Sequence, residues 1–357
     1  MRAALFESFN QPYVVKDVPV PTELHPYQML LRTGAAGFCH TDELIRTGGM
    51  PVSLKHDLIG GHEPAGTVVD LGEDAAKYGW HIGQRVGALG YMGYCGTCPD
   101  CKDGRLNYCT KLSDGGFLGM SCQGVFSEYC LVDYRSAVEL PDTMSFVEAA
   151  PLFCAGATMY NAILTAKQPQ GAILGIVGLG ALGHLGVQFA KSMGYVVVGV
   201  DARDEPIELA KSLKLAPHLC LDAREGVESA TKAIAALNPE KPFPGLDACI
   251  VATDWIPSFQ YGLDILTRHG TLIVVGQPAE KIPFHFSDLI FKDITVKGSL
   301  LASPENCKAL IEHVALHPVE IKVKTYKLDD VTEMVHDLHQ PGMKGKFVVE
   351  FEQTQVL

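Results

Sequence analysis

The middle of the chain alternates short apolar runs with amphipathic segments. Apolar, β-branched runs predict buried strands at residues 172–178, 195–201, 246–254 and 271–278. Apolar residues at helical spacing predict helices at residues 181–194, 204–215 and 258–270. Strands that alternate with helices in this way are typical of a parallel sheet with helices on both faces. We therefore expect a doubly wound sheet over about residues 155–300.

The two ends of the chain have a different sequence pattern. Up to about residue 154, β-branched runs such as residues 28–38 and 65–72 are separated by loops rich in Gly and Pro. This pattern predicts an irregular β domain. A helical pattern at residues 303–316 and an apolar strand at residues 344–352 follow later. A length of 357 residues is large for one hydrophobic core, so we expect two domains.

Composition and charge exclude several classes of partner. Residues 168–190 are uncharged and long enough to cross a bilayer, but their six glycines disfavour a transmembrane helix. The net charge of −12 argues against nucleic acid or an anionic membrane, because both require a basic surface. The first ten residues lack the apolar core of a secretory signal. We therefore expect a cytoplasmic protein whose eleven cysteines are reduced.

A glycine pattern, Gly178-x-Gly180-x-x-Gly183, follows the strand predicted at residues 173–177 and precedes a helix that begins near Ala181. Gly178 allows a tight turn, Gly180 lets the backbone approach a pyrophosphate, and Gly183 lets the helix pack against the strand. The pyrophosphate would lie at the N-terminus of the helix. The surrounding elements favour a dinucleotide site over a packed turn without a ligand.

The strand predicted at residues 195–200 ends in Asp201, eighteen residues after Gly183. A carboxylate at this position accepts hydrogen bonds from ribose hydroxyls and repels a 2′-phosphate, so NAD is favoured over NADP. Arg203 lies two residues later and weakens this preference, because a nearby arginine can accommodate the 2′-phosphate.

Four cysteines lie within residues 93–109, with the spacing C-x2-C-x2-C-x7-C: Cys95, Cys98, Cys101 and Cys109. Disulfides, a redox pair, an iron–sulfur cluster, a zinc site and ordinary core thiols all stay open at this point. The first three cysteines are too close in sequence to staple much of a fold, which disfavours disulfides.

Three other segments carry metal-type ligands: Cys39, His62 and Cys154. Two thiolates and one imidazole suit a catalytic zinc site, which leaves one position open for water or substrate. Glu63 follows His62, and such a carboxylate can orient a ligand histidine or become a fourth ligand. Each residue alone is more typical of an ordinary core or surface position. Spacing alone does not show that the three segments meet.

Together these motifs resemble the zinc-dependent alcohol dehydrogenases of the medium-chain dehydrogenase/reductase superfamily. The resemblance covers nearly the whole chain and rests on GFCHTD, GGHEPAG, the four-cysteine loop, PLFCAGATMY and VGLGALG in the order of the family. It implies an α/β fold, with a GroES-like catalytic domain at residues 1–154 and 301–357 and a Rossmann NAD-binding domain at 155–300. GGHE and CAGAT are most similar to the yeast-like branch, which implies a homo-oligomer, with a tetramer ahead of a dimer.

The resemblance also implies roles for single residues. It implies two zinc ions per chain, one structural at the four-cysteine loop and one catalytic at Cys39, His62 and Cys154, where Glu63 can move onto the metal. Asp42 would hydrogen-bond the ligand histidine, and Thr41 would receive the proton of the substrate. The implied cofactor contacts are His40, Gly178, Gly180, Ala181, Leu182, Gly183, Asp201 and Lys346, of which His40 and Lys346 would reach the pyrophosphate.

Three positions depart from the family pattern. Leu44 replaces a histidine that often passes the proton to solvent, so the relay must end at the ribose hydroxyl and water or use another group, for which His56 is a candidate. Met50 and Gly90 stand where yeast-like enzymes carry bulky tryptophans. These residues imply a pocket that is less crowded, and a substrate larger than ethanol.

The resemblance implies a reversible oxidation of a primary or secondary alcohol to an aldehyde or ketone, with hydride transfer to NAD. Three alternatives remain beside it: an NADPH-preferring aldehyde or ketone reductase of a biosynthetic pathway, a zinc hydrolase, and a non-catalytic NAD-binding protein. The dinucleotide fingerprint disfavours the hydrolase, and the complete ligand set disfavours the non-catalytic protein.

Overall fold

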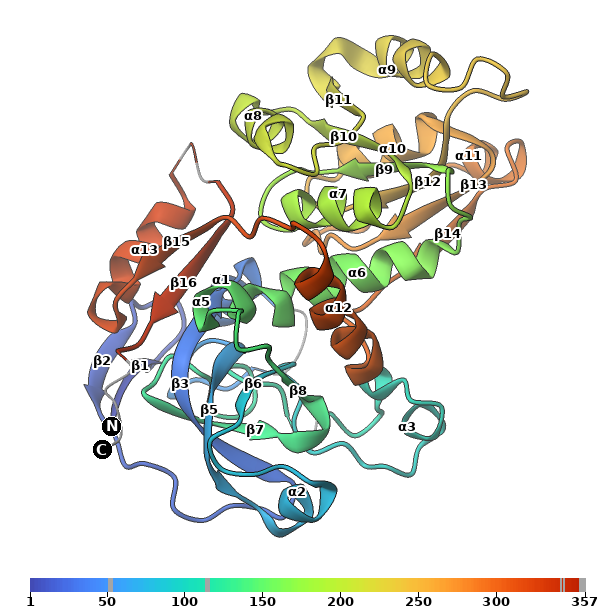
Figure 1. Ribbon diagram of the computed structural model, residues 1–357. Helices are drawn as coiled ribbons and strands as arrows, with labels where there is room; N and C mark the ends of the chain where they lie inside the picture. Colours follow the sequence, from blue (N-terminus) through green and yellow to red (C-terminus); the bar gives the residue numbers. More distant parts are fainter. Residues whose placement is uncertain (51–53, 113–115, 341, 343, 353–357) are drawn as a thin grey trace.

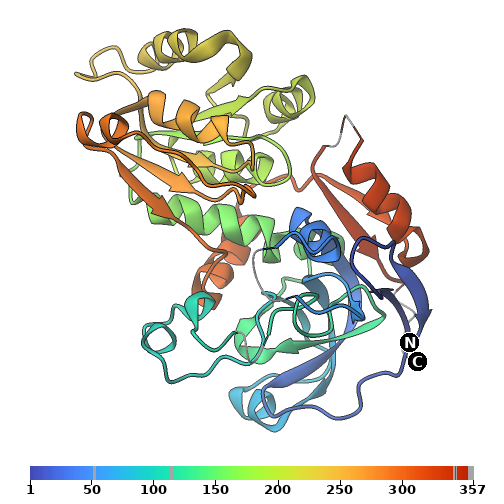
Figure 2. The same cartoon turned by 180° about the vertical axis from the view of Figure 1, so that it is seen from behind.

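The computed structural model describes residues 1–50, 54–112, 116–340, 342 and 344–352. The chain forms two lobes, one built on a parallel sheet with helices on both faces and the other on irregular β structure (Figure 1, Figure 2). Helix α6 (Ala155–Ala166) lies between the lobes in both views. This architecture confirms the predicted combination of a GroES-like domain and a Rossmann sheet.

The parallel lobe contains six strands in the order β11-β10-β9-β12-β13-β14. The strands are β9 (Ile173–Val177), β10 (Val196–Asp201), β11 (Leu219–Asp222), β12 (Leu246–Val251), β13 (Leu266–Val274) and β14 (Thr295–Gly298). The helices of this lobe are α7 (Gly183–Ser192), α8 (Asp204–Ser212), α9 (Gly226–Ala235), α10 (Pro257–Asp264) and α11 (Phe286–Ile290). The central strand β9 is buried along its whole length, because helices cover both faces of the sheet (Figure 1).

The second lobe contains a seven-stranded sheet in the order β15-β16-β3-β5-β6-β8, with β7 paired to β3. Its strands are β3 (Gln28–Phe38), β5 (Glu63–Leu71), β6 (Arg85–Ala88), β7 (Tyr129–Asp133), β8 (Ala137–Glu139), β15 (Val323–Tyr326) and β16 (Lys346–Glu350). A smaller sheet contains β1 (Arg2–Phe6), β2 (Val14–Asp17) and β4 (Leu58–Ile59). The remaining helices are α1 (His40–Arg46), α2 (Glu73–Tyr78), α3 (Pro99–Lys102), α5 (Phe146–Ala149), α12 (Pro304–Leu316) and α13 (Val331–Leu338).

The C-terminal segment returns to the lobe that contains the N-terminus. Strand β16 pairs antiparallel with β3, and Phe347 lies opposite Phe38. This pairing brings residues that are about 300 positions apart next to each other. The domain boundaries at residues 154 and 300 stay predictions.

Several predicted element boundaries differ from the structure, for example at the ends of α8, β12 and β13, and two of these differences have a clear cause. Helix α7 begins at Gly183 rather than near Ala181, because the glycine turn occupies the residues before it. The helix predicted to extend to residue 270 ends at Asp264, and strand β13 already begins at Leu266. Leu266 pairs with Leu246 of β12, so sheet pairing takes over residues whose apolar spacing also suits a helix.

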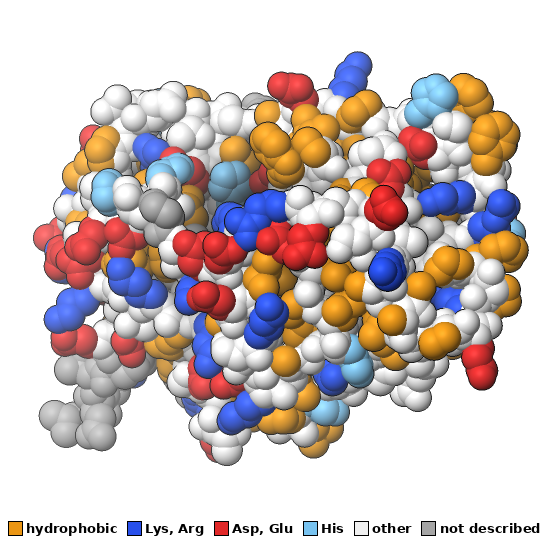
Figure 3. Space-filling model, turned by 90° about the horizontal axis from the view of Figure 1, so that it is seen from above, with side chains coloured by type: hydrophobic (Ala, Val, Ile, Leu, Met, Phe, Trp, Pro, Cys, Tyr) orange, Lys and Arg blue, Asp and Glu red, His pale blue; other side chains and the backbone are white. Residues whose placement is uncertain are grey.

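The uncharged stretch at residues 168–190 folds as strand β9, the glycine turn and most of helix α7. Within the described ranges, no single helix has the length and apolar composition to cross a membrane, although one bent pair, Phe146–Phe153 with Ala155–Ala166, meets the same test. Basic and acidic side chains are interspersed over the face shown in Figure 3. This face shows no continuous basic surface of the kind that nucleic acid requires.

Candidate active site

Cys39, His62 and Cys154 come together in space. The Sγ atoms of Cys39 and Cys154 are 3.8 Å apart, and Nε2 of His62 is 3.3 Å from Sγ of Cys154. With Glu63 they form a group whose potential ligand atoms all lie within 4.8 Å of one another. Tetrahedral zinc at its usual bond lengths places two thiolates about 3.8 Å apart, so the spacing fits this metal. The role of these residues as zinc ligands stays a proposal.

Adjacent strands position two of these residues. Strands β3 and β5 pair antiparallel, with Gly37 opposite Glu63, so Cys39 and His62 lie just beyond neighbouring strand ends. A Cβ atom on Gly37 would lie 2.0 Å from Oε2 of Glu63, so only glycine leaves room for this carboxylate. Cys154 immediately precedes helix α6, 92 positions after His62 in the chain.

Asp42 fixes the orientation of the histidine. Nδ1 of His62 lies 2.6 Å from Oδ1 of Asp42, and Oδ2 of Asp42 accepts the backbone N–H of Cys39 at 2.9 Å. The carboxylate therefore favours the proton on Nδ1 and leaves Nε2 turned toward the cysteines. Burial lowers the pKa of His62, but Asp42 and Cys39 outweigh burial and raise this pKa well above its ordinary value.

Lys346 is fully buried and is bound to Glu63. Its Nζ donates to Oε1 of Glu63 at 2.6 Å and to the carbonyl of Phe38 at 2.9 Å. The side chain also lines a cleft beside the cluster, and its ammonium is paired with a carboxylate. Its contact with a cofactor pyrophosphate stays a prediction. Burial raises the pKa of Glu63 to about 7, although Lys346 opposes this shift. Oε2 of Glu63 is buried without a hydrogen-bond partner among the described residues, which suits a cation beside it.

The four-cysteine loop forms a second compact sulfur cluster around α3: Cys95, Cys98, Cys101 and Cys109. Cys95 Sγ is 3.9 Å from Cys101 Sγ and accepts the backbone N–H groups of Cys98 at 3.3 Å and Thr97 at 3.4 Å. These N–H groups stabilise a thiolate and lower the pKa of Cys95 to about 5. All eleven cysteines of the chain are described, and none forms a disulfide. Four convergent sulfurs fit a closed tetrahedral zinc site.

The glycine fingerprint has the geometry of a dinucleotide turn. Gly178 has a φ of +94°, which favours glycine, and a Cβ atom on Gly183 would lie 1.9 Å from the carbonyl oxygen of Gly178. A Cβ atom on Gly180 would meet only Arg203, at 3.6 Å, so its backbone faces open space. This space belongs to a cleft of about 540 Å³, which we call the cofactor cleft. Its lining includes Thr41, the predicted proton acceptor, and six predicted cofactor residues: His40, Gly178, Gly180, Ala181, Leu182 and Lys346.

Asp201 lies at the end of β10, where a ribose would bind. Its carboxylate accepts the backbone N–H groups of Leu179 at 2.8 Å and Ala202 at 2.9 Å. The guanidinium of Arg203 also contacts it, with Nε 3.2 Å from Oδ1. Asp201 is nearly buried, whereas 62% of the Arg203 side chain is exposed. The Arg203 side chain can therefore move away while the Asp201 carboxylate keeps its hydrogen bonds to the backbone.

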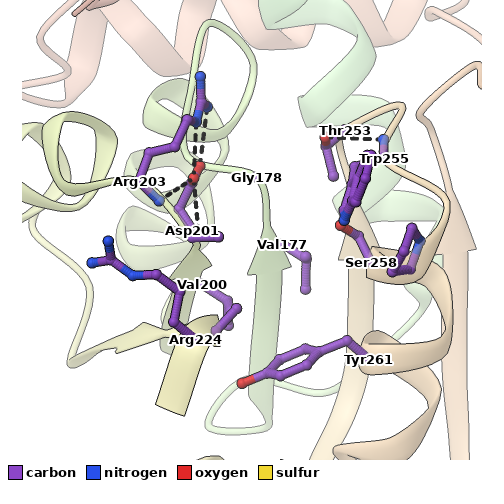
Figure 4. Close-up of a pocket in the computed structure, with 13 residues that line it drawn as sticks. Val177, Gly178, Val200, Asp201, Arg203, Arg224, Thr253, Trp255, Ser258 and Tyr261 are labelled. Atoms are coloured by element: carbon purple, nitrogen blue, oxygen red, sulfur yellow. Dashed lines mark hydrogen bonds and ion pairs between the residues drawn. The ribbon is translucent and has the colours of Figure 1, made fainter. Parts of the chain in front are cut away.

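Asp201 and Arg203 form one wall of a cavity of about 510 Å³ beside the cleft, and Trp255 and Tyr261 lie on the opposite wall (Figure 4). Arg224 lines the same cavity but is held by Asp222, whose Oδ1 lies 2.8 Å from its Nε. The cavity therefore combines an aromatic wall with two guanidinium groups. Its chemistry suits the adenosine half of a dinucleotide.

A third cavity, of about 550 Å³, extends from the cysteine and histidine cluster. Its lining is mainly apolar and includes Met50, Tyr91, Leu112, Phe117, Met120, Leu300 and Leu301. Thr41 and Cys154 line both this cavity and the cofactor cleft. The candidate metal site thus lies where the two cavities meet, and we refer to the third one as the apolar cavity.

Two sequence predictions about the pocket need correction. Met50 lines the apolar cavity, but the space beside Gly90 is filled, because a Cβ atom there would lie 2.9 Å from the ring of Phe117. The Phe117 ring also packs against His62, with ring centroids 5.2 Å apart. His56 packs against Phe9 and is absent from the described linings of both cavities, so its position does not support a role in the proton relay.

Comparison with known proteins agrees with this geometry. The family models for an alcohol dehydrogenase GroES-like domain and a zinc-binding dehydrogenase match residues 25–142 and 181–315. An alcohol dehydrogenase of Geobacillus stearothermophilus is 31% identical over 352 residues, which are 99% of this chain and 100% of that protein. The chain belongs to the zinc-type alcohol dehydrogenases. It is therefore an oxidoreductase, whereas its assignment to the yeast-like branch stays a prediction.

Solved structures of related dehydrogenases differ in their cofactor. The acetophenone reductase of Geotrichum candidum, in complex with NAD, has 25% identity and a TM-score of 0.84, covering 98% of this chain and 97% of its own. A putative zinc-binding dehydrogenase of Sinorhizobium meliloti, bound to NADP, has 25% identity and a TM-score of 0.85, covering 98% and 99%. Membership of the family therefore does not determine whether this alcohol dehydrogenase prefers NAD or NADP, and the preference has to be inferred from its own residues.

The sequence analysis missed three residues of the site. Gly37 leaves room for Glu63, Phe117 fills the wall beside His62, and Arg224 lines the cavity shown in Figure 4. The glycine next to a ligand-bearing strand end was a usable signal, since glycine inside a strand often marks a close approach. Phe117 lies in a loop and Arg224 in a short 3₁₀ helix (Ala223–Glu225), and no local pattern predicts the course of either segment.

Proposed function

We propose that the protein oxidises a primary or secondary alcohol reversibly to an aldehyde or ketone with NAD, and that each chain holds two zinc ions. One observation carries this proposal: the cluster of Cys39, His62 and Cys154 lies where the cofactor cleft and the apolar cavity meet. When bound, zinc supplies a Lewis acid for the substrate oxygen and the nicotinamide supplies the hydride acceptor.

The residues of the chain hold these groups and move the proton. Cys39, His62 and Cys154 would hold the catalytic metal, and Asp42 would keep Nε2 of His62 directed at it. Thr41 lines both cavities, with its hydroxyl 3.7 Å from Sγ of Cys39, so it is placed to accept the proton of the substrate hydroxyl. Its neighbour Leu44 also lines the cleft but cannot carry a proton onward, which leaves a ribose hydroxyl and water.

The apolar cavity supports a substrate larger than ethanol. Its volume of about 550 Å³ lies in the range of cavities that enclose drug-sized ligands. Cofactor-dependent absorbance of reduced nicotinamide, followed with primary, secondary and aromatic alcohols and their carbonyl products, tests the reaction. Failure of every substrate with both cofactors would contradict the proposal.

An NADPH-preferring aldehyde or ketone reductase is the second candidate. Arg203 and Arg224 both line the cavity of about 510 Å³, and guanidinium groups at such a site favour a 2′-phosphate. The pairing of Arg203 with Asp201 and the ties of Arg224 to Asp222 and Asp204 leave less of this positive charge available. We therefore keep NAD as the preferred cofactor.

Cofactor preference gives a first testable prediction. The wild-type protein should bind NADH more tightly than NADPH, and Asp201→Ser should narrow this preference by about tenfold, because it removes an anion that repels the 2′-phosphate. Dissociation constants from reduced-cofactor fluorescence measure this directly. Arg203→Ala is the matched comparison, and it should weaken the binding of NADPH without weakening the binding of NADH. Tighter binding of NADPH by the wild type would show that Asp201 does not select the cofactor.

We also propose a homo-oligomer, with a tetramer ahead of a dimer. Strand β14 ends the parallel sheet and is largely exposed, and an exposed strand edge can pair with a second copy. Three large apolar side chains nearby in sequence, Phe286, Ile290 and Phe291, are each at least 60% exposed. Exposed apolar groups of this size are typical of an association surface. Light scattering that gives the 38.6 kDa mass of one chain would contradict the proposal.

A further inference from the structure

One charged side chain besides the candidate metal ligands lines the apolar cavity, and it belongs to the exposed residue Lys55. Among its described lining residues, Lys55 alone is a cation, and the remaining side chains are apolar or neutral and polar. The ammonium of Lys55 forms no hydrogen bond or ion pair within the described part of the chain. The backbone N–H of Lys55 donates to the carbonyl of Met120 at 3.2 Å, which ties it to the cavity wall.

Three other polar side chains of this cavity, those of Asn107, Ser121 and Ser299, already have partners. Asn107 Nδ2 donates to the carbonyl of Leu300 at 2.7 Å, and Oγ of Ser121 accepts the backbone N–H of Phe117 at 2.8 Å. Oγ of Ser299 lies 3.1 Å from Nδ2 of Asn161. Lys55 therefore offers three donors and a positive charge that the protein does not use. In a chain with a net charge of −12, this local cation favours an anionic ligand.

We propose that the preferred substrates are hydroxy or oxo acids in which an apolar body separates the reacting carbon from a carboxylate. Lys55 would bind the carboxylate while the hydroxyl or carbonyl reaches the cluster of His62 and Cys154, since all three residues line the same cavity. This inference rests on the proposed alcohol dehydrogenase activity. The carboxylate does not react: the carbinol carbon loses a hydride to NAD, the hydroxyl loses a proton, and the product is an oxo acid.

Three substrates that differ only at the para position of benzyl alcohol test this inference: 4-(hydroxymethyl)benzoate, its methyl ester and benzyl alcohol itself. The wild type should turn over the benzoate with a kcat/KM about five- to tenfold above that of the ester, because a charge-assisted contact adds this much binding. The difference should lie in KM, since the distal contact is the same in the ground and transition states. It should shrink as salt is added.

Substitutions of Lys55 distinguish the effect of its charge from an effect on the structure of the cavity. Lys55→Met should abolish the preference for the benzoate and leave kcat for benzyl alcohol unchanged, whereas Lys55→Arg should retain the preference. Lys214→Met is the matched control, because it removes the same charge from an exposed residue outside the cavity. A wild type that does not distinguish benzoate from ester would overturn the inference, as would an equal loss on all three substrates in Lys55→Met. Inactivity of the wild type on a wider alcohol panel would instead overturn the proposed function itself.

Discussion

Cys154→Ala is expected to abolish alcohol oxidation, with a loss of about 10³-fold or more, while the protein stays folded. Cys154 is one of three convergent candidate ligands, 3.8 Å from Cys39 and 3.3 Å from His62, and two ligands would hold zinc poorly. Loss of the Lewis acid removes several kcal/mol of transition-state stabilisation, which accounts for the size of the effect. The zinc content measured by metal analysis should fall from two ions per chain to one.

Cys98→Ala should fail in a different way. It removes one sulfur from the four-cysteine loop, and metal affinity at a structural site contributes directly to folding. The zinc count should again fall to one, but thermal unfolding should shift to a clearly lower temperature. Cys220→Ala is the control, since Cys220 is a half-buried free thiol in β11 outside both clusters. Equal loss of thermal stability in Cys154→Ala and Cys98→Ala would contradict the division into catalytic and structural metal.

Much of this architecture could be predicted because its signals are local. The turn at Gly178 and Gly180 needs glycine for its backbone angle and its open face, so sequence spacing and structure express the same constraint. Strand β9 is apolar throughout because it is buried on both faces, which the uninterrupted apolar run already indicated. The residue types at Cys39 and His62 likewise indicated a metal site, although local spacing alone could not show that the two residues lie close together.

Other features depend on long-range packing. The absence of a side chain at Gly90 suggested an open pocket, but Phe117 inserts its ring there from a loop 27 residues later. The buried pair of Glu63 and Lys346 joins residues 283 positions apart, so a lysine predicted to reach the cofactor also pairs with a carboxylate beside the candidate metal. No periodicity or local spacing in the sequence reveals the pair of Glu63 and Lys346, because it forms only when β16 and β5 both pair with β3.

Thr41→Ala should reduce kcat for alcohol oxidation by about 10² to 10⁴-fold at every pH, the usual contribution of a positioned proton acceptor. Thr41 is placed for this role because its side chain borders both the cofactor cleft and the apolar cavity. Thr41→Ser keeps the hydroxyl and should retain most of the activity, which distinguishes loss of the proton acceptor from loss of packing. Equal damage in the serine and alanine variants would show that the hydroxyl is not the acceptor.

The next step of proton release should respond to Leu44. Leu44 lies three residues after Thr41 on helix α1, a spacing that places both side chains on one face, and both line the cofactor cleft. Leu44→His should therefore accelerate alcohol oxidation modestly at neutral pH, where an imidazole with an ordinary pKa near ~6.5 can accept protons. The gain should vanish at high pH, where hydroxide already accepts the proton.

The measurement for both positions is the pH profile of kcat, run with ordinary and deuterated alcohol. A large isotope effect shows that hydride transfer limits turnover, and Leu44→His can then change kcat only through proton loss that precedes or accompanies this step. Water entering the cleft replaces part of the missing relay in the wild type, so the effect at Leu44 should be smaller than that at Thr41. A wild-type profile that is already independent of pH, together with an unchanged rate in Leu44→His, would mean that another group completes the relay. The position of His56 against Phe9 makes it a poor candidate for that group.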